Sequence, residues 1–421
     1  MAAPALAKRP CDHPTTSSSS CRDTKRHRPI TAPAPPTMER HDDEAAPSPS
    51  PSPSQPLLPG LPDHLAQLCL TPLPPRLLHA VCRPWRRLLY APSFPPFPAL
   101  YALLEDTING HAPSFAAYDP IAARWDALPP PPMPSPPPTL CHPSFLSRRL
   151  PLQCVAAAGR LVLVAGSTHS LRPALPRPLV FDPAGPRWHA GPRVPLAPRR
   201  WCAAGAARGR VFLAGGVGAG YDLAVARSGA CWDPAAAPSS AAWEPAPPLR
   251  DGRFSRDAAE AVCSRGKVCM VSLRGRGAKE GAVLDLDERR WEDMPPGMLA
   301  GWNGPAAASP DTGDAIFLVD EELGALNAYD WEADRWRTVT EAEPLKGASE
   351  MAAGGGRVCV VADCGKKVVV VDVTTTAKAT TTRRNSTSTS TAAPRMWEVE
   401  APEGRRIVSL HVLPRMTRPD Q

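Results

Sequence analysis

Cysteines and histidines are the residues whose spacing most readily indicates a metal site, and this 421-residue chain has twelve cysteines and ten histidines. No two cysteines form a CxxC pair, and the closest spacings, Cys263 with Cys269 and Cys359 with Cys364, are not matched by histidines as zinc sites require. Most cysteines lie in apolar runs, which is typical of buried thiols in a reducing compartment. We therefore expect no metal site, no cofactor and no catalytic set.

A glycine-rich stretch at residues 215–220, with the sequence GGVGAG, follows an apolar run and resembles a dinucleotide-binding loop. In such loops the third glycine stands at a fixed offset, and a helix follows directly. Here the third glycine falls at another offset, and no helical pattern follows. We expect a turn at this stretch and no nucleotide site.

Arginine and tryptophan are enriched among the residues that contribute most of the binding energy in protein interfaces. They gather in three predicted loops, which contain Arg199, Arg200 and Trp201; Arg250, Arg253, Phe254 and Arg256; and Trp302 and Asn303. We predict that one rim of the fold binds a protein with an acidic or aromatic surface through Arg199, Arg200, Trp201, Arg253, Arg256 and Trp302. The alternative is that each is a solvated residue near a turn.

Apolar residues at helical spacing predict three short helices between residues 61 and 90. The three sets are Leu65, Leu68 and Cys69; Leu77, Leu78 and Val81; and Trp85, Leu88 and Leu89. Pro84 suits this pattern if a new helix begins there. So little chain cannot bury so many leucines, and the unit needs a neighbouring domain or a partner to cover them.

This stretch resembles an F-box, a helical motif that docks on the adaptor Skp1 of cullin-based ubiquitin ligases. The matching residues are Leu61-Pro62-Asp63, Leu65, Leu70, Leu73-Pro74, Leu77, Val81-Cys82-Arg83, Trp85-Arg86 and Leu88-Leu89. Pro84 departs from the family, which has a polar or basic helix former there. The resemblance implies adaptor binding through Leu61, Pro62, Leu65, Leu70, Leu73, Pro74, Leu77, Val81, Cys82, Trp85, Leu88 and Leu89. The alternative is a small helical subdomain packed on the main body.

From Leu100 onward one unit recurs six times, in which an Asp ends a strand, a turn follows and a Trp begins the next strand. The pairs are Asp119 and Trp125, Asp182 and Trp188, Asp233 and Trp243, Asp285 and Trp291, Asp330 and Trp336, and Asp372 and Trp397. In four of the six pairs the two residues are six positions apart. Asp at the first position, followed in three units by Pro, suits a type I turn.

Each Asp is preceded by an apolar strand, and before most of those lies a strand of small residues. Small side chains suit the crowded innermost position of a radial array of four-stranded sheets, which is a β-propeller. The Gly215-Gly216 pair, the Arg-Trp pairs and the Trp spacings of 45 to 63 residues resemble kelch repeats. The alternative is an all-β sandwich with six unrelated tryptophans.

We predict a mainly β fold with a six-bladed kelch-type propeller at 99–413, an F-box at 56–98, a disordered tail at 1–55 and a short tail at 414–421. Unit one lacks an inner strand, and residues 406–413 are expected to supply it. The proline-rich and Thr/Ser-rich insertions, about 128–150 and 374–394, are predicted to be disordered.

Charge and targeting signals place the chain in the cytoplasm, the nucleus or both. The net charge of +7 is spread along the chain, so a nucleic-acid partner is not expected. We find neither a secretory signal nor an apolar run long enough to span a membrane. The cluster Lys25-Arg26-His27-Arg28 is a candidate nuclear import signal.

The order of the two parts resembles the plant F-box/kelch-repeat proteins of the Skp1-interacting-partner group. That resemblance implies a non-catalytic receptor of an SCF-type ubiquitin ligase, whose F-box binds Skp1 and through it a cullin, and whose propeller binds the protein target. One alternative is a kelch scaffold that binds a partner without ubiquitination. A second is a kelch copper oxidase, which would need clustered Tyr and His residues that this chain lacks.

Overall fold

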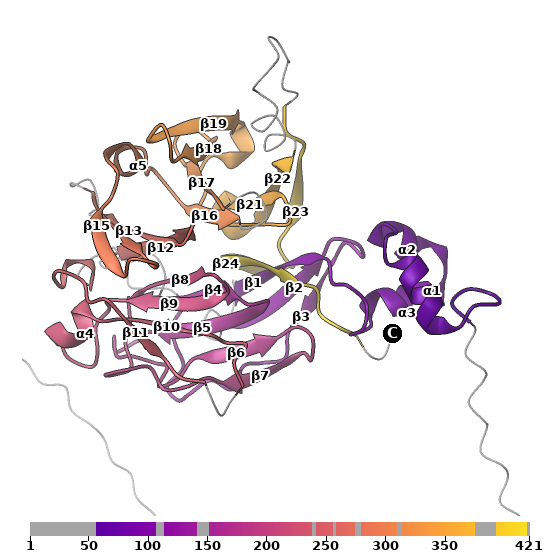
Figure 1. The fold of residues 1–421 in the computed structure, drawn as a ribbon, viewed down its shortest axis with the longest axis horizontal. Helices are drawn as coiled ribbons and strands as arrows, with labels where there is room; N and C mark the ends of the chain where they lie inside the picture. Colours follow the sequence, from indigo (N-terminus) through magenta and orange to yellow (C-terminus); the bar gives the residue numbers. More distant parts are fainter. Residues whose placement is uncertain are drawn as a thin grey trace, which may run out of the picture. The chain divides into compact units, whose positions relative to one another are not determined.

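The computed structural model describes residues 56–106, 113–140, 151–237, 241–255, 258–273, 279–309, 314–374 and 393–418 (Figure 1). The predicted disordered tail at 1–55, its basic cluster, Arg256 and the residues 141–150 and 375–392 lie outside this part of the chain. In the described part, no helix is long and apolar enough to cross a membrane.

Three short helices open the described chain: α1 (Asp63–Leu70), α2 (Pro75–Val81) and α3 (Arg83–Tyr90). A proline stands at or next to the start of each helix, where a backbone N–H would have no hydrogen-bond partner within the helix, so its absence costs nothing. Pro84 is tolerated because α3 begins at Arg83, as predicted. The helices share a core of Leu70, Leu78, Leu88, Leu89, Tyr90, Phe94 and Phe97.

Six antiparallel four-stranded sheets, the blades, follow the helices. Blade one contains β1 (Pro98–Asp106), β2 (Ser114–Asp119), β3 (Arg124–Ala127) and β24 (Arg405–Pro414); blade two contains β4 (Leu152–Ala157), β5 (Arg160–Gly166), β6 (Leu179–Asp182) and β7 (Arg187–Ala190). Blade three contains β8 (Ala203–Ala207), β9 (Arg210–Ala214), β10 (Gly229–Trp232) and β11 (Glu244–Ala246); blade four contains β12 (Ala258–Ser264), β13 (Lys267–Leu273), β14 (Glu280–Asp285) and β15 (Arg290–Asp293). Blade five contains β16 (Ala306–Ser309), β17 (Ala315–Asp320), β18 (Ala325–Asp330) and β19 (Arg335–Glu341); blade six contains β20 (Glu350–Gly354), β21 (Arg357–Ala362), β22 (Lys367–Asp372) and β23 (Met396–Glu400).

The inner strands contact one another in the cyclic order β24, β4, β8, β12, β16, β20 and back to β24. This ring confirms the six-bladed propeller and rules out two stacked sheets. β24 pairs with β1 over its whole length, with Ala99 opposite Leu413 and Ala102 opposite Leu410. The prediction that the last strand completes blade one is therefore confirmed.

The apolar core of the propeller is divided into six clusters, and each draws its residues from two neighbouring blades. Between blades one and two, for example, the rings of Tyr101 and Phe181 lie 6.2 Å apart. Because each blade is buried on both faces, its second and third strands are nearly continuous apolar runs, as in Val368–Val371. Burial between blades is what holds the ring together.

The six repeated aspartates share one local role. The Oδ1 of each accepts a hydrogen bond, 2.8 to 3.0 Å long, from the backbone N–H two residues later. This contact stabilises the turn that leads into the outermost strand. The Asp-to-Trp spacing recurs because the turn requires it.

Five of the six repeated tryptophans hold neighbouring blades together. Each donates its Nε1–H to a backbone carbonyl of the preceding blade or its outgoing loop: Trp125 to Glu400, Trp188 to Pro129, Trp243 to Pro192, Trp291 to Pro247 and Trp336 to Met298, at 2.7 to 3.3 Å. Trp397 has no such bond within the described residues, and its side chain is 38% exposed under the guanidinium of Arg357.

Two local predictions are wrong. The proline-rich stretch is ordered up to residue 140, because Leu128 and Leu140 are buried between blades one and two and the Thr139 N–H bonds the Ser167 carbonyl at 2.8 Å. The glycine-rich stretch is followed by a helix after all, α4 (Leu223–Arg227), although it is only five residues long. The remaining short helices are α5 (Pro296–Ala300), η1 (Arg253–Ser255), η3 (Glu343–Leu345) and η4 (Asp363–Gly365).

Candidate functional site

The propeller has two faces that differ in the connections they carry. Turns from first to second and from third to fourth strand lie at one end of each antiparallel blade, and the remaining loops lie at the other. The helices join blade one at Pro98, which begins β1, the second strand of that blade. Pro98 therefore lies at the end that carries the turns from first to second strand. We call this end the helix face, and the end with the blade-to-blade loops the loop face.

The helical unit exposes a set of large apolar side chains. Leu65 (42% exposed) and Leu68 (68%) are neighbours on one side of α1, and Leu61 (39%) lies just before that helix. Leu77 (47%) and Val81 (51%) are one turn apart on α2. Five of the eleven large apolar side chains found exposed in the described chain thus fall within 21 residues. We call these five residues the apolar helix surface. Such a concentration marks a surface that another protein covers.

The predicted adaptor-binding residues divide into three groups by burial. Leu61, Pro62, Leu65, Pro74, Leu77 and Val81 are exposed, and Leu73, Cys82 and Trp85 are partly buried. Leu70, Leu88 and Leu89 are buried in the core of the helical unit, so their assignment to the binding surface is corrected. Leu68 was missed, although it stands three residues after Leu65 and therefore on the same side of α1.

On the propeller, two predicted binding residues are wrong because they are buried. Arg199, 1% exposed, donates from Nη1 to the Gly215 carbonyl at 3.1 Å and from Nη2 to the Pro195 carbonyl at 2.8 Å. Trp302 is fully buried and packs edge-on against Trp336, with ring centroids 5.9 Å apart. Neither side chain is available to a partner, and both instead hold loops in place.

Three segments of the loop face are joined by buried polar contacts in blade three. Arg200 and Val217 exchange backbone hydrogen bonds of 2.9 Å. The Ser255 hydroxyl accepts from the Gly216 N–H at 2.9 Å and donates to the Ala226 carbonyl at 3.0 Å. Gly216 has a φ of +90°, and a Cβ there would lie 2.8 Å from the Arg200 carbonyl oxygen. The glycine pair is therefore explained by the close approach of these two loop segments, and not by a nucleotide-binding site.

On these segments lies a set of accessible side chains that we call the blade-three platform: Leu196, Arg200, Trp201, Tyr221, Leu223 and Arg253. The Arg200 guanidinium lies 4.4 Å from the centre of the Trp201 ring. Burial, and secondarily the positive charge of Arg172, lower the pKa of Arg200. Leu196 and Trp201 have φ of +65° and +59°, a strained conformation for such residues that is found often at functional sites.

The other arginine of the platform, Arg253, and the neighbouring Arg250 are already paired. Arg253 forms ion pairs with Asp251 at 2.6 Å and with Glu280 at 3.1 Å, and Arg250 contacts Asp293 at 3.0 Å. The predicted group of positive charges at this rim is thus weaker than the sequence indicated. Arg200, stacked on Trp201 and lying near Arg172, is the arginine of the platform for which the structure gives no carboxylate contact among the described residues.

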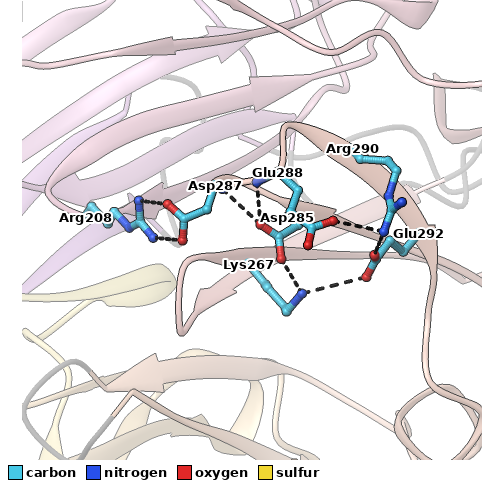
Figure 2. A network of polar contacts seen from close by, with 7 residues as sticks. All are labelled: Arg208, Lys267, Asp285, Asp287, Glu288, Arg290 and Glu292. Carbon is cyan, nitrogen blue, oxygen red and sulfur yellow. Dashed lines mark hydrogen bonds and ion pairs between the residues drawn. The ribbon is translucent and has the colours of Figure 1, made fainter.

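The helix face of blades three and four carries a network of ion pairs that serves the fold (Figure 2). Arg208 binds both carboxylate oxygens of Asp287, at 2.7 and 2.6 Å, and so connects a turn of blade three to a turn of blade four. Lys267 contacts Asp285 at 2.6 Å, and this hydrogen bond lowers the pKa of Asp285 to about 2. Because these charges satisfy one another, they offer little to a partner.

The centre of the ring contains a cavity of about 650 Å³, lined by the small residues of the inner strands together with Cys154, Cys263 and His411. Burial raises the pKa of Cys154 to about 12 and lowers that of His411 to about 4, so both are neutral near pH 7. A protonated thiol is a poor nucleophile. In the described part of the chain, no group of three or more His, Cys, Asp or Glu side chains could hold a metal ion.

Comparison with known proteins relates the chain to a plant protein of two parts. No family model matches the chain. The chain is 41% identical over 380 residues to the F-box/kelch-repeat protein SKIP25 of Arabidopsis thaliana, and the match covers 86% of this chain and 91% of that protein. The match therefore extends over both the helical unit and the propeller.

Proposed function

This chain belongs to the F-box/kelch-repeat family, and we propose from this premise that it is the substrate-recognition subunit of an SCF-type E3 ubiquitin ligase. In this proposal the helical unit binds a Skp1-type adaptor and through it a cullin, and the propeller binds the protein that is ubiquitinated. The observation that supports it most directly is the apolar helix surface. The helical unit has a packed core of its own, yet it leaves these five side chains in water.

Covering the apolar helix surface would contribute substantially to adaptor binding. Fully burying one leucine or valine side chain is worth about 1.5–3 kcal/mol, and these five are now between 39% and 68% exposed. Leu70, Leu78 and Leu89 hold α1, α2 and α3 together before any partner arrives. The surface is therefore presented in a preformed state, which lowers the ordering cost of binding.

For the target we propose the blade-three platform on the loop face. The helical unit joins the ring at the opposite face, so adaptor and target would not compete for the same surface. The subunit itself would contribute no catalytic group. It would act by raising the concentration of the target near the ubiquitin-carrying enzyme.

Adaptor binding is tested by Leu65→Glu with Leu77→Glu, which introduces two charges into the apolar helix surface. We expect affinity for a purified Skp1-type adaptor, measured by calorimetry, to fall more than 100-fold, because each charge would have to be desolvated. The matched control is Leu323→Glu, an exposed leucine (59%) in blade five, which should bind as the wild type does. Equal binding by both variants would contradict the proposal.

The target surface is tested by Arg200→Glu with Leu223→Glu, since both side chains lie on the blade-three platform. Proteins captured by the wild type and by this variant are compared by mass spectrometry. We expect the adaptor in both samples and the target only with the wild type. A captured partner that is present in both samples would place its binding elsewhere, and a wild-type complex that lacks the adaptor would favour the scaffold alternative.

A further inference from the structure

The chain crosses from α3 to β1 through one linker, residues 91–97, and the segment after β24 returns to that linker. A single linker between two folded units ordinarily lets one pivot against the other. Here residues 415–418 contact the end of α3, the linker, blade one and blade two. These four residues carry the inference that follows.

The guanidinium of Arg415 binds backbone carbonyls of the linker. This side chain is 3% exposed, and its Nη2 donates to the Ala91 carbonyl at 2.9 Å and to the Phe94 carbonyl at 3.1 Å. Its backbone N–H bonds the Phe97 carbonyl at 2.9 Å, and its charge lies 5.8 Å from the ring centres of Tyr90 and Phe97. A cation is also favoured here by the carbonyl end of α3.

Arg418 connects the last residue of α3 to blade one. Its guanidinium lies 4.4 Å from the centre of the Tyr90 ring, contacts Asp119 at 3.2 Å and also bonds Asp126. The Tyr90 hydroxyl donates to the same Asp119 oxygen, Oδ2, at 2.5 Å. Burial and this hydrogen bond raise the pKa of Tyr90, so the hydroxyl remains a donor at all physiological pH values.

Asp119 is the repeated aspartate that has gained a second role. Its Oδ1 accepts from the N–H groups of Ile121 and Ala122, as the turn requires, while Oδ2 faces Tyr90 and Arg418. Of the six repeated aspartates, all of which are described, only Asp119 is buried, at 4% exposed. Ile121 of the same turn packs against the core of the helical unit.

Thr417 extends the contact to blade two. Its hydroxyl donates to the Ala184 carbonyl at 2.7 Å, and its N–H bonds the Pro183 carbonyl at 3.0 Å. The segment is thus held on two blades on one side and on the α3 end and the linker on the other. Contacts on both sides of a pivot oppose rotation about it.

We propose that Arg415–Arg418 is a clasp that fixes the helical unit in one orientation on the ring, with Arg415 and Arg418 as positioning residues. Its consequence for ubiquitin transfer rests on the proposed function, but the fixed orientation does not. A target held at a constant place relative to the ligase has a higher effective concentration at the enzyme than one that swings on a flexible linker.

The orientation is measured by pulsed electron paramagnetic resonance on the full chain. Of the cysteines in the described residues, only Cys69 on α1 and Cys364 in η4 are exposed, so they provide one spin-label site in each part. Cys11, Cys21 and Cys141 are replaced by Ser beforehand. We expect a narrow distance distribution for the wild type and a broad one for Arg418→Ala and for Arg415→Ala with Arg418→Ala.

Two controls separate the clasp from general damage. Arg187→Ala removes an exposed arginine at the start of β7 and should leave the distribution narrow. Arg418→Lys keeps the charge and should restore most of the narrow component. Far-ultraviolet circular dichroism shows whether the double variant, Arg415→Ala with Arg418→Ala, loses its helices. If it does, the distance distribution of Arg418→Ala alone decides whether the clasp fixes the orientation. A distribution as narrow as the wild type in Arg418→Ala would overturn the proposal.

The functional readout uses a reconstituted ligase at saturating target. We expect Arg418→Ala to slow ubiquitin transfer by about tenfold while the dissociation constants for adaptor and target stay unchanged. Unchanged transfer together with a broad distance distribution would refute the role in transfer. If the chain bound no adaptor at all, the proposed function would fail, and the distance measurement would still decide the clasp.

Discussion

The hydroxyl of Tyr101 donates a hydrogen bond of 2.7 Å to the backbone carbonyl of Pro414, 313 residues further along the chain. Tyr101 lies on β1 and is fully buried, and Pro414 ends β24. This contact lies where the two ends of the propeller meet. Ring closure therefore depends on a pairing that no neighbouring repeat can supply.

Removing the strand that closes the ring should destabilise the protein far more than removing one hydrogen bond at the closure. A chain that stops after Gly404 lacks β24 and leaves the apolar strand β1 as an unpaired edge, so we expect aggregation by size-exclusion chromatography. Tyr101→Phe should only lower the free energy of unfolding by about 1 kcal/mol, measured in urea. A chain that stops after Arg418 is the control and should behave as the wild type. A monomeric, cooperatively folding Gly404 truncation would contradict this view.

The repeated tryptophans should contribute different amounts to the free energy of unfolding, although they occupy the same position in the repeat. Trp291 is buried and bonds the Pro247 carbonyl at 2.9 Å, so Trp291→Phe should lower the free energy of unfolding by about 1–3 kcal/mol. Trp397→Phe replaces a partly exposed indole by a phenyl ring and should change the free energy of unfolding by no more than about 0.5 kcal/mol. Equal losses in chemical denaturation would show that the bond between blades contributes nothing measurable.

Arg199 and Arg200 are adjacent, but substitution of Arg199 should lower stability, whereas substitution of Arg200 should lower target affinity. Arg199→Met leaves the buried Gly215 carbonyl and the partly buried Pro195 carbonyl without their donor, so we expect a loss of about 2–4 kcal/mol in the free energy of unfolding. Arg200→Met should change stability by less than about 1 kcal/mol and lower target affinity instead. Thermal unfolding and target binding of both variants check this, and a destabilised Arg200→Met would reverse the assignment.

His411 should make the ring less stable in mild acid. Burial lowers its pKa from 6.5 to about 4, and its Nε2 lies 3.1 Å from the Ser409 hydroxyl. Between these two values the unfolded chain takes up the proton more readily than the folded one, so stability falls as the pH falls from about 6.5 towards 4. His411→Gln should show a shallower decline of the unfolding free energy over that range. Parallel curves for the two proteins would exclude this contribution.

The repeat could be predicted from the sequence because its signals are local. An aspartate two residues before the amide that it binds, and a tryptophan after the turn, occupy fixed positions in the chain whatever the rest of the fold does. Six such pairs at kelch-like spacing led to the blade count, and the missing inner strand of blade one led to the closure by β24. The short helices followed from apolar spacing and proline positions in the same way.

The errors share a different cause, which is that burial depends on neighbours distant in sequence. Arg199 and Trp302 looked like binding residues because arginine and tryptophan often are. Arg199 is instead enclosed by loops of blade three, and Trp302 lies in the apolar core between blades four and five. Leu88 and Leu89 belong to the F-box pattern, but they face the core of the helical unit and not its surface. The proline-rich stretch was predicted to be disordered, whereas Leu128 and Leu140 anchor its first half in the apolar core between blades one and two.

Residue order alone thus determined the architecture: a leucine-rich helical unit, six Asp–Trp blades and a last strand that returns to the first. Only the tertiary structure decided which side chains remain available to other molecules, and that the segment after β24 binds the α3 end and two blades. The physical reason is that turns and strands depend on interactions within a few residues. Exposure and long-range ion pairs such as Arg418 with Asp119 exist only once the ring has closed.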